Sequence, residues 1–71
     1  MKFIECIEAA LKVAERGESA EGLGMARVIR QDAVSLGEVH VWSDGAVAFP
    51  SAEIKIEDLK ESLEASDWEM L

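Results

Sequence analysis

The sequence is poor in the residues that most often carry chemistry: it holds one cysteine, one histidine, one proline and no tyrosine. A single cysteine, Cys6, excludes an internal disulfide, and no Cys/His cluster has the spacing of a structural zinc site. His40 has no nucleophile placed near it in the sequence that it could activate. The pair Asp44-Gly45 fits a turn, and the pattern of an EF-hand calcium loop is missing. We therefore expect a protein that is not an enzyme and that needs no cofactor or metal.

Basic residues are scarce as well. Seven Lys and Arg stand against fifteen Asp and Glu, for a net charge of -8. This sign disfavours nucleic-acid binding, which depends on cations that neutralise phosphates, and it disfavours anionic membrane surfaces. It favours basic partners through electrostatic steering. The alternative is that the charge only keeps the protein soluble.

The chain also lacks a long apolar run. No stretch approaches the ~20 residues that span a bilayer, and Glu5 comes too early for a secretory signal peptide. We therefore expect a cytoplasmic protein, in a reducing compartment, in which Cys6 is a free and buried thiol.

The length favours self-association. Residues 1–71 are expected to form a single domain, and a chain of this size buries only about 60% of its unfolded surface. Small domains of this kind usually need a disulfide, a structural metal or a partner subunit. With disulfide and zinc excluded, we expect a homodimer or a higher oligomer.

Two elements are predicted in the first half of the chain. Residues 2–16 show the three- and four-residue spacing of an amphipathic helix that ends at Gly17; its apolar face is formed by Phe3, Ile7, Ala10, Leu11 and Ala14. Residues 17–24 are glycine-rich and are expected to form a loop. Residues 25–30 alternate as a strand that places Arg27 on one face and Arg30 on the other.

The stretch "EVHVWSDGAVAFP" predicts a β-hairpin. Asp44-Gly45 is a preferred pair for a two-residue type I′ turn, which would set Trp42 opposite Val47 and His40 opposite Phe49. Both faces of the hairpin would then be apolar. A chain this short has helices for one face, so the other suggests contact with another copy or a partner. The alternative is that both helices, or long loops, cover both faces.

The last third of the chain is predicted to be an acidic helix and a short terminal strand. Residues 56–65 fit a helix with Ile56, Leu59 and Leu63 on one face and three glutamates on another, namely Glu57, Glu61 and Glu64. In "LEASDWEML" we expect Trp68 and Met70 to enter the core while Asp67 and Glu69 face water. The expected fold class is α+β, with an N-terminal helix, a small antiparallel sheet containing the Asp-Gly hairpin, the acidic helix and the terminal strand.

Three segments resemble a known family. "FIECIEAALK" (residues 3–12) resembles the opening helix, "DGAVAFP" the penultimate hairpin, and "IEDL" with "LEASDWEML" the final Ala-x-Asp-Trp-Glu turn of the phage Thoeris anti-defense-like family of small proteins. The resemblance implies a small oligomeric α+β domain of phage or mobile-element origin. It also implies a possible role as a sponge that sequesters a cyclic nucleotide immune signal.

Two functional hypotheses follow, beside the alternative of a soluble oligomeric domain of unrelated function, such as a toxin-neutralising or regulatory partner. In the first, the protein is an anti-CRISPR-like inhibitor that binds a host defence protein and occludes its basic, nucleic-acid-binding surface. The contacts would come from the acidic side chains and one aromatic: Glu57, Glu61, Glu64, Asp67, Glu69 and Trp42. In the alternative, the protein is the cyclic nucleotide sponge, with Arg27 and Arg30 binding phosphate and Trp42 stacking on the base.

Overall fold

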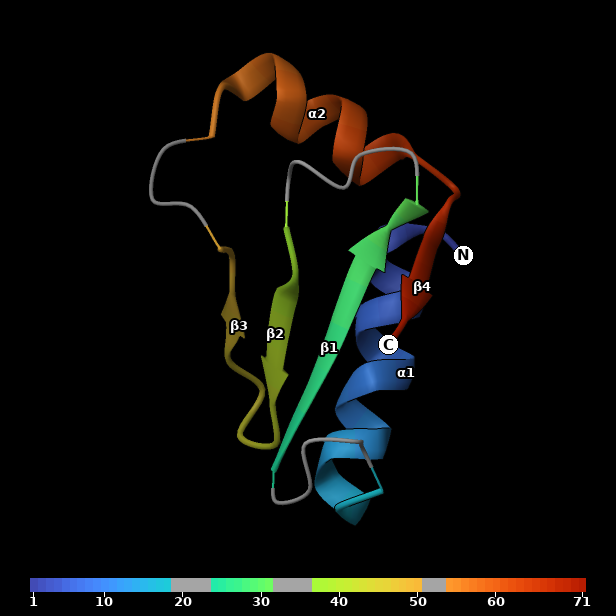
Figure 1. Ribbon diagram of the computed structural model, residues 1–71, viewed down its shortest axis with the longest axis vertical. Helices are drawn as coiled ribbons and strands as arrows, with labels where there is room; N and C mark the ends of the chain where they lie inside the picture. Colours follow the sequence, from blue (N-terminus) through green and yellow to red (C-terminus); the bar gives the residue numbers. More distant parts are fainter. Residues whose placement is uncertain (19–23, 32–36, 51–53) are drawn as a thin grey trace.

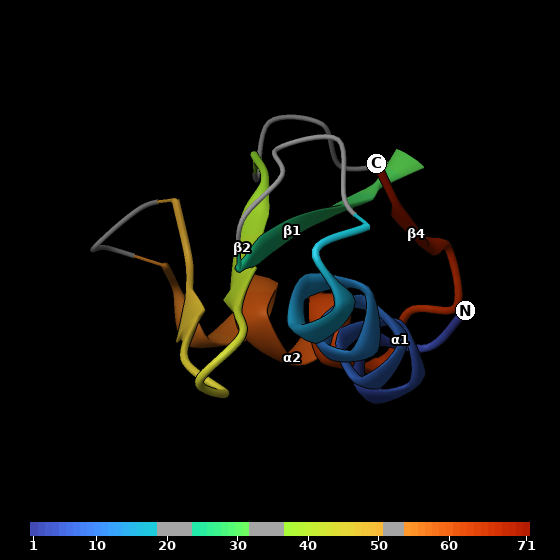
Figure 2. The ribbon, with the colours of Figure 1, turned by 90° about the horizontal axis from the view of Figure 1, so that it is seen from below.

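The computed structural model describes residues 1–18, 24–31, 37–50 and 54–71. In chain order the elements are α1 (Phe3–Arg16), β1 (Met25–Arg30), β2 (Val39–Trp42), β3 (Val47–Ala48), α2 (Ile56–Glu64) and β4 (Trp68–Met70). The strands form one antiparallel sheet in the order β3-β2-β1-β4. Both helices lie on the same side of this sheet (Figures 1 and 2). The α+β fold predicted from the sequence is confirmed.

Helix α1 matches the predicted helix closely. The backbone N–H of Lys2 donates to Oε1 of Glu5 at 3.2 Å, which satisfies one free donor of the first turn. At the other end Gly17 has φ +70°, and the N–H groups of Gly17 and Glu18 donate to the carbonyls of Ala14 and Val13. This is the usual glycine-terminated helix end. The buried face of α1 carries small side chains below Phe3, so the helix packs close to the sheet.

Strand β1 lies in the middle of the sheet and forms its core. Its buried side consists of Ala26, Val28 and Arg30, and Arg27 lies on the opposite face, as the alternation predicted. On one edge it pairs with β2, where Arg27 lies opposite His40, and on the other with β4, where Arg30 lies opposite Trp68. The hydrophobic core between β1, its neighbours and α1 is formed by Phe3, Cys6, Ala10, Ala14, Ala26, Val28, Val39, Val41 and Trp68.

The β2–β3 hairpin differs from the prediction by one residue. His40 lies opposite Ala48 and Val41 opposite Val47. The N–H of Trp42 donates to the carbonyl of Ala46, and the N–H of Gly45 donates to the carbonyl of Trp42, each at 2.9 Å. Gly45 has φ +92°, whereas no described residue other than glycine has a positive φ. The loop therefore has three residues, a tight turn followed by a left-handed glycine, and the predicted two-residue turn is wrong.

This register reverses the faces of β3. Because side chains alternate along a strand, a shift of one residue exchanges its two sides. Val47 and Phe49 share the helix side with Val41, and the ring of Phe49 stacks on Phe3 with 5.9 Å between centroids. The predicted opposition of His40 and Phe49 is not formed, and His40 lies with Trp42 on the outer face.

The C-terminal elements follow the prediction with one exception. Helix α2 ends at Glu64, and its buried residue is Ser62, whereas Ile56 is 75% exposed. In β4, Trp68 is buried and Met70 packs against the core, as expected. Most of the loop predicted for residues 17–24 lies outside the described residues, as do residues 32–36 and 51–53.

Candidate functional site

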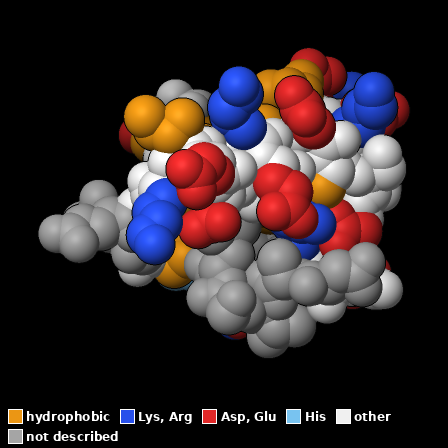
Figure 3. Space-filling view, turned by 90° about the horizontal axis from the view of Figure 1, so that it is seen from above, with side chains coloured by type: hydrophobic (Ala, Val, Ile, Leu, Met, Phe, Trp, Pro, Cys, Tyr) orange, Lys and Arg blue, Asp and Glu red, His pale blue; other side chains and the backbone are white. Residues whose placement is uncertain are grey.

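The exposed carboxylates of α2 form the most strongly charged feature of this end of the molecule. Glu57, Glu61 and Glu64 are all exposed, and Figure 3 shows carboxylates on this face interspersed with lysine and arginine side chains, with hydrophobic side chains at several places between them. We name these three side chains the acidic ridge. Its position on a regular helix holds the three carboxylates at fixed spacing along one side.

The acidic ridge is only partly explained by helix stability. Glu57 lies in the first turn of α2, where a negative charge is favourable to the helix dipole. Glu64 is the last residue of the helix, and the last turn has no basic residue. A carboxylate at this end faces unpaired carbonyl groups and is electrostatically unfavourable. Glu64 therefore has no structural benefit to α2 that would account for its charge.

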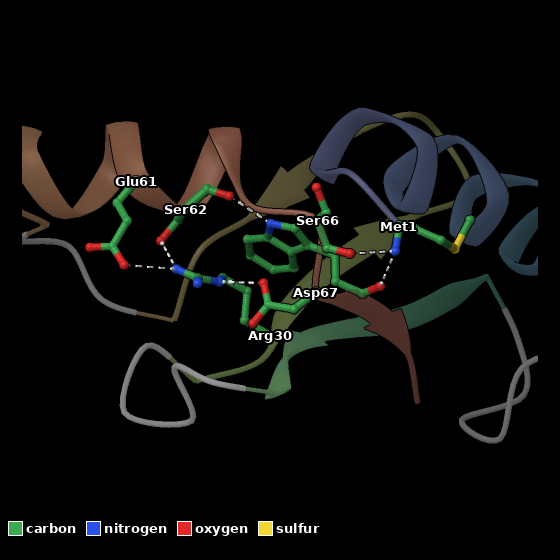
Figure 4. A network of polar contacts seen from close by, with 7 residues as sticks. Met1, Arg30, Glu61, Ser62, Ser66 and Asp67 are labelled. Carbon is green, nitrogen blue, oxygen red and sulfur yellow. Dashed lines mark hydrogen bonds and ion pairs between the residues drawn. The ribbon is translucent and has the colours of Figure 1, made fainter.

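Arg30 connects the sheet to α2. Its side chain is buried, its Nε donates to Oδ1 of Asp67 at 2.9 Å, and its Nη1 donates to Oγ of Ser62 at 3.3 Å. Oε1 of Glu61 lies 3.9 Å from the same Nη1, as Figure 4 shows. Burying a guanidinium is tolerable only when it is paired and hydrogen-bonded. These contacts meet that requirement and fix α2 over the end of β1.

Asp67 is part of this network and does not face water as predicted. Its side chain is only 22% exposed, and its carboxylate is turned toward Arg30. The sequence pattern placed Arg30 on the face of β1 opposite Arg27, but alternation can identify neither the buried face nor a partner 37 residues away. Asp67 therefore stabilises the fold and is removed from the surface proposed for partner binding.

Trp68 anchors the terminal segment. Its Nε1 donates to the carbonyl of Ser62 at 2.7 Å, and its ring meets Phe3 edge to face with 4.8 Å between centroids. The Met1 nitrogen donates to the carbonyls of Ser66 and Trp68 at 2.8 and 3.1 Å (Figure 4). These contacts bring the two ends of the described chain together beside β4.

The other residues predicted to bind a partner lie elsewhere. Glu69 is exposed on β4 and accepts a hydrogen bond from Nε2 of Gln31 at 2.6 Å. Trp42 ends β2 opposite Met25, at the start of β1, so it lies at the end of the sheet away from α2 (Figure 1). The acidic ridge is thus one surface, while Glu69 and Trp42 are separate from it.

The alternative ligand site is not assembled as one group. Arg27 and Trp42 share the outer face of the sheet, while Arg30 points to the helix side. Nη1 of Arg27 contacts both carboxylate oxygens of Glu38, at 3.0 and 2.9 Å, and Nε2 of His40 lies 3.8 Å from Oε2 of the same carboxylate. A carboxylate at this position competes with any phosphate for Arg27.

Cys6 is buried and free, as expected. Burial raises the pKa of its thiol, and the charge of Glu69 acts in the same direction, while the nearby N-terminus lowers it. A thiol of raised pKa is a poor nucleophile and a poor metal ligand at neutral pH. Among the described residues, no three His, Cys, Asp or Glu side chains are grouped so that they could hold a metal ion.

Comparison of the chain with protein-family models, with curated proteins and with solved structures found no match. The resemblance to the Thoeris anti-defense-like family therefore remains a hypothesis based on the quoted motifs. In the part of the chain that the structure describes, no helix combines the length and the apolar character needed to cross a membrane.

Proposed function

We propose that the protein is a non-enzymatic counter-defence inhibitor of phage or mobile-element origin, acting in the host cytoplasm. Its acidic ridge, Glu57, Glu61 and Glu64, docks on a basic nucleic-acid-binding surface of a host defence complex. The observation that carries this proposal is that these exposed carboxylates lie on one rigid helix, and that one of them opposes the helix dipole. A cationic partner would remove that unfavourable interaction.

The net charge also supports docking on a basic surface. At -8 for 71 residues, the protein attracts a basic surface over long range and binds it with a fast, salt-sensitive association rate. A protein that covers a cationic channel needs no catalytic group. This agrees with the lack of a nucleophile–base pair in the sequence.

The test uses purified CRISPR effector complexes, with the binding of their target DNA as the readout. Wild-type protein is expected to block DNA binding by at least one effector. Replacing Glu57, Glu61 and Glu64 together by Gln is expected to weaken that block by about tenfold or more, mainly through slower association.

A matched control separates position from total charge. Glu8, Glu15 and Glu18 are also exposed, and they lie on α1 or just beyond it. Replacing these three by Gln changes the net charge by the same amount and should leave the block nearly unchanged. Equal loss in both triple variants, or no loss in either, would remove the acidic ridge as the docking surface.

The cyclic nucleotide sponge is the second candidate. It is favoured by the shared outer face of Arg27 and Trp42, where a phosphate and a base could be bound side by side. The buried pairing of Arg30 and the contact of Arg27 with Glu38 count against it. Calorimetric titration with a panel of cyclic nucleotides tests it directly, and absence of heat and of a thermal shift across the panel would eliminate it.

A further inference from the structure

Among the described residues, the largest aliphatic side chains are not fully buried, although Ile7 and Leu11 pack against the core. The buried aliphatic residues are alanine and valine, which pack around Cys6, Phe3 and Trp68. Isoleucine and leucine are among the residues most often fully buried in proteins. Here none of the described ones is, and this holds for Ile4, Ile7, Leu11, Ile29, Ile54, Ile56, Leu59, Leu63 and Leu71. This distribution is unusual for a chain that is complete as a monomer.

Three exposed members of this group belong to the two helices, which lie on one side of the sheet. Ile56 and Leu63 of α2 are 75% and 43% exposed, and Ile4 of α1 is 62% exposed. Val47 and Phe49, which the observed register turns to the same side, are each more than a third exposed. Both helices lie on this side, and α2 extends toward β3 (Figures 1 and 2). We name these five side chains the apolar surface.

We propose that the apolar surface is the interface with a second copy of this chain, in a dimer in which the α2 helices pack antiparallel. Ile56 and Leu63 are seven residues apart, about 10.5 Å along the helix axis. A two-fold axis that passes beside α2 midway between these residues sets Ile56 of each copy against Leu63 of the other. The same contact therefore forms twice. One patch thus serves both sides of the contact, as a two-fold interface requires.

The charged side chains beside Ile56 and Leu63 also fit an antiparallel pair of α2 helices. Lys60 lies between Ile56 and Leu63, at four residues from one and three from the other, and Glu57 and Glu64 lie on the flank next to it. In an antiparallel pair, equivalent flanks of the two helices meet. Each Lys60 then comes within reach of Glu57 of the second copy. A parallel pair would instead set this charged flank against the opposite flank of the other helix.

The area agrees with a weak dimer. The exposed parts of the five side chains amount to roughly 300 Å² per copy, the size of the largest apolar patch on a typical monomer. Two copies contribute about 600 Å², and because homodimer interfaces are about 65% apolar, the whole interface is roughly 900 Å². This lies just below the roughly 1,000 Å² expected of a stable specific interface, so a weak and reversible dimer is expected.

The experiment is sedimentation equilibrium of the full chain across roughly 1–200 µM, where a micromolar dimer dissociates. Leu63→Glu and Leu71→Glu form a matched pair, since the two leucines are 43% and 47% exposed and the change in charge is the same. Leu63→Glu is expected to raise the dissociation constant by about tenfold or more, while Leu71→Glu leaves it unchanged. Circular dichroism checks that both variants remain folded.

A charge exchange tests the antiparallel geometry independently of apolar area. Lys60→Glu should weaken the dimer, and adding Glu57→Lys to it should restore most of the loss. A wild-type protein that stays monomeric at about 200 µM would overturn the proposal. So would a dimer that is lost in Leu71→Glu and kept in Leu63→Glu.

Salt separates this interface from the proposed inhibitory contact. Each copy carries a net charge of -8, so screening should strengthen the dimer. Docking of the acidic ridge on a basic surface should weaken under the same change. A dimer that dissociates as salt rises would exclude the apolar surface as its main source of affinity, whatever the outcome of the inhibition assays.

Discussion

Arg30 and Asp67 form a hydrogen-bonded ion pair of 2.9 Å that joins the end of β1 to the residue before β4. Ser62 of α2 accepts a further hydrogen bond from the same guanidinium, so one side chain holds three elements together. The pair is largely shielded from water, with Arg30 the more buried of the two. The pair is therefore a structural feature of the fold. Arg27, the other described arginine of the sheet, lies half-buried on the opposite face.

Removal of this guanidinium should destabilise the protein strongly. Arg30→Ala leaves the partly buried carboxylate of Asp67 without its partner and is expected to lower the free energy of unfolding by about 2–4 kcal/mol. Urea denaturation followed by tryptophan fluorescence measures this change. Arg16→Ala, at an exposed position on α1, is the control and should leave the midpoint near that of the wild type.

A double-mutant cycle identifies the pair as the cause. Arg30→Met combined with Asp67→Asn removes both charges and should cost less than the sum of the two single changes. Strict additivity would mean that the ion pair with Asp67 contributes little and that Arg30 acts through its other contacts, such as Ser62.

The terminal strand should be essential for folding. Truncation after Ser66 removes Asp67 from Arg30, Trp68 from Phe3 and a pairing strand from β1. A chain of this size has little stability to spare, so the truncated protein is expected to lose its cooperative thermal transition in circular dichroism. Trp68→Phe keeps most of the apolar contact and loses the hydrogen bond to the Ser62 carbonyl. This variant should fold with a lower midpoint of thermal unfolding. A truncated protein that still folds well would contradict the essential role of the terminal strand.

The sequence was sufficient for the elements that have a clear period. The alternation in residues 25–30 predicted which side chains of β1 share a face, and Trp68 and Met70 identified β4. The hairpin register was not predictable, because Asp44-Gly45 suits both a two-residue loop and the observed three-residue loop that ends in a left-handed glycine. The acidic ridge was visible as a helical repeat of glutamates, and its exposure is observed.

The contacts missed by sequence reasoning are those between residues far apart in the chain. Ser62 stands where an apolar residue is expected on the inner side of α2, and a buried serine there is the one local sign that a polar partner is near. Glu38 and Gln31 gave no such sign, since polar residues beside strands are common. Their roles depend on the sheet register, which brings Glu38 to Arg27 and Gln31 to Glu69.

Two glycines of the hairpin region should differ in their tolerance of a side chain. Gly37 and Gly45 have φ +83° and +92°, so Ala is strained at both. A Cβ on Gly37 would also lie 2.9 Å from Cγ of Pro50, whereas nothing lies within 4 Å of a Cβ on Gly45. Gly45→Ala is therefore expected to cost about 1 kcal/mol, and Gly37→Ala more than that, measured by urea denaturation. Equal costs would show that Pro50 moves aside freely.

The buried thiol of Cys6 predicts a loss of stability at alkaline pH. Burial is the main cause that raises its pKa above that of the unfolded chain, about 8.5 for an ordinary thiol. Below that pH the thiol is protonated in both states and its contribution is fully present. As pH rises above it, the unfolded chain releases the proton first, and the free energy of unfolding falls by up to about 1.4 kcal/mol per pH unit. Cys6→Ala should be less stable at neutral pH, because a cavity is left, yet lose less stability between pH values of about 8.5 and 10.5. Parallel pH profiles for the two proteins would show that the thiol titrates in the folded state as it does in the unfolded chain.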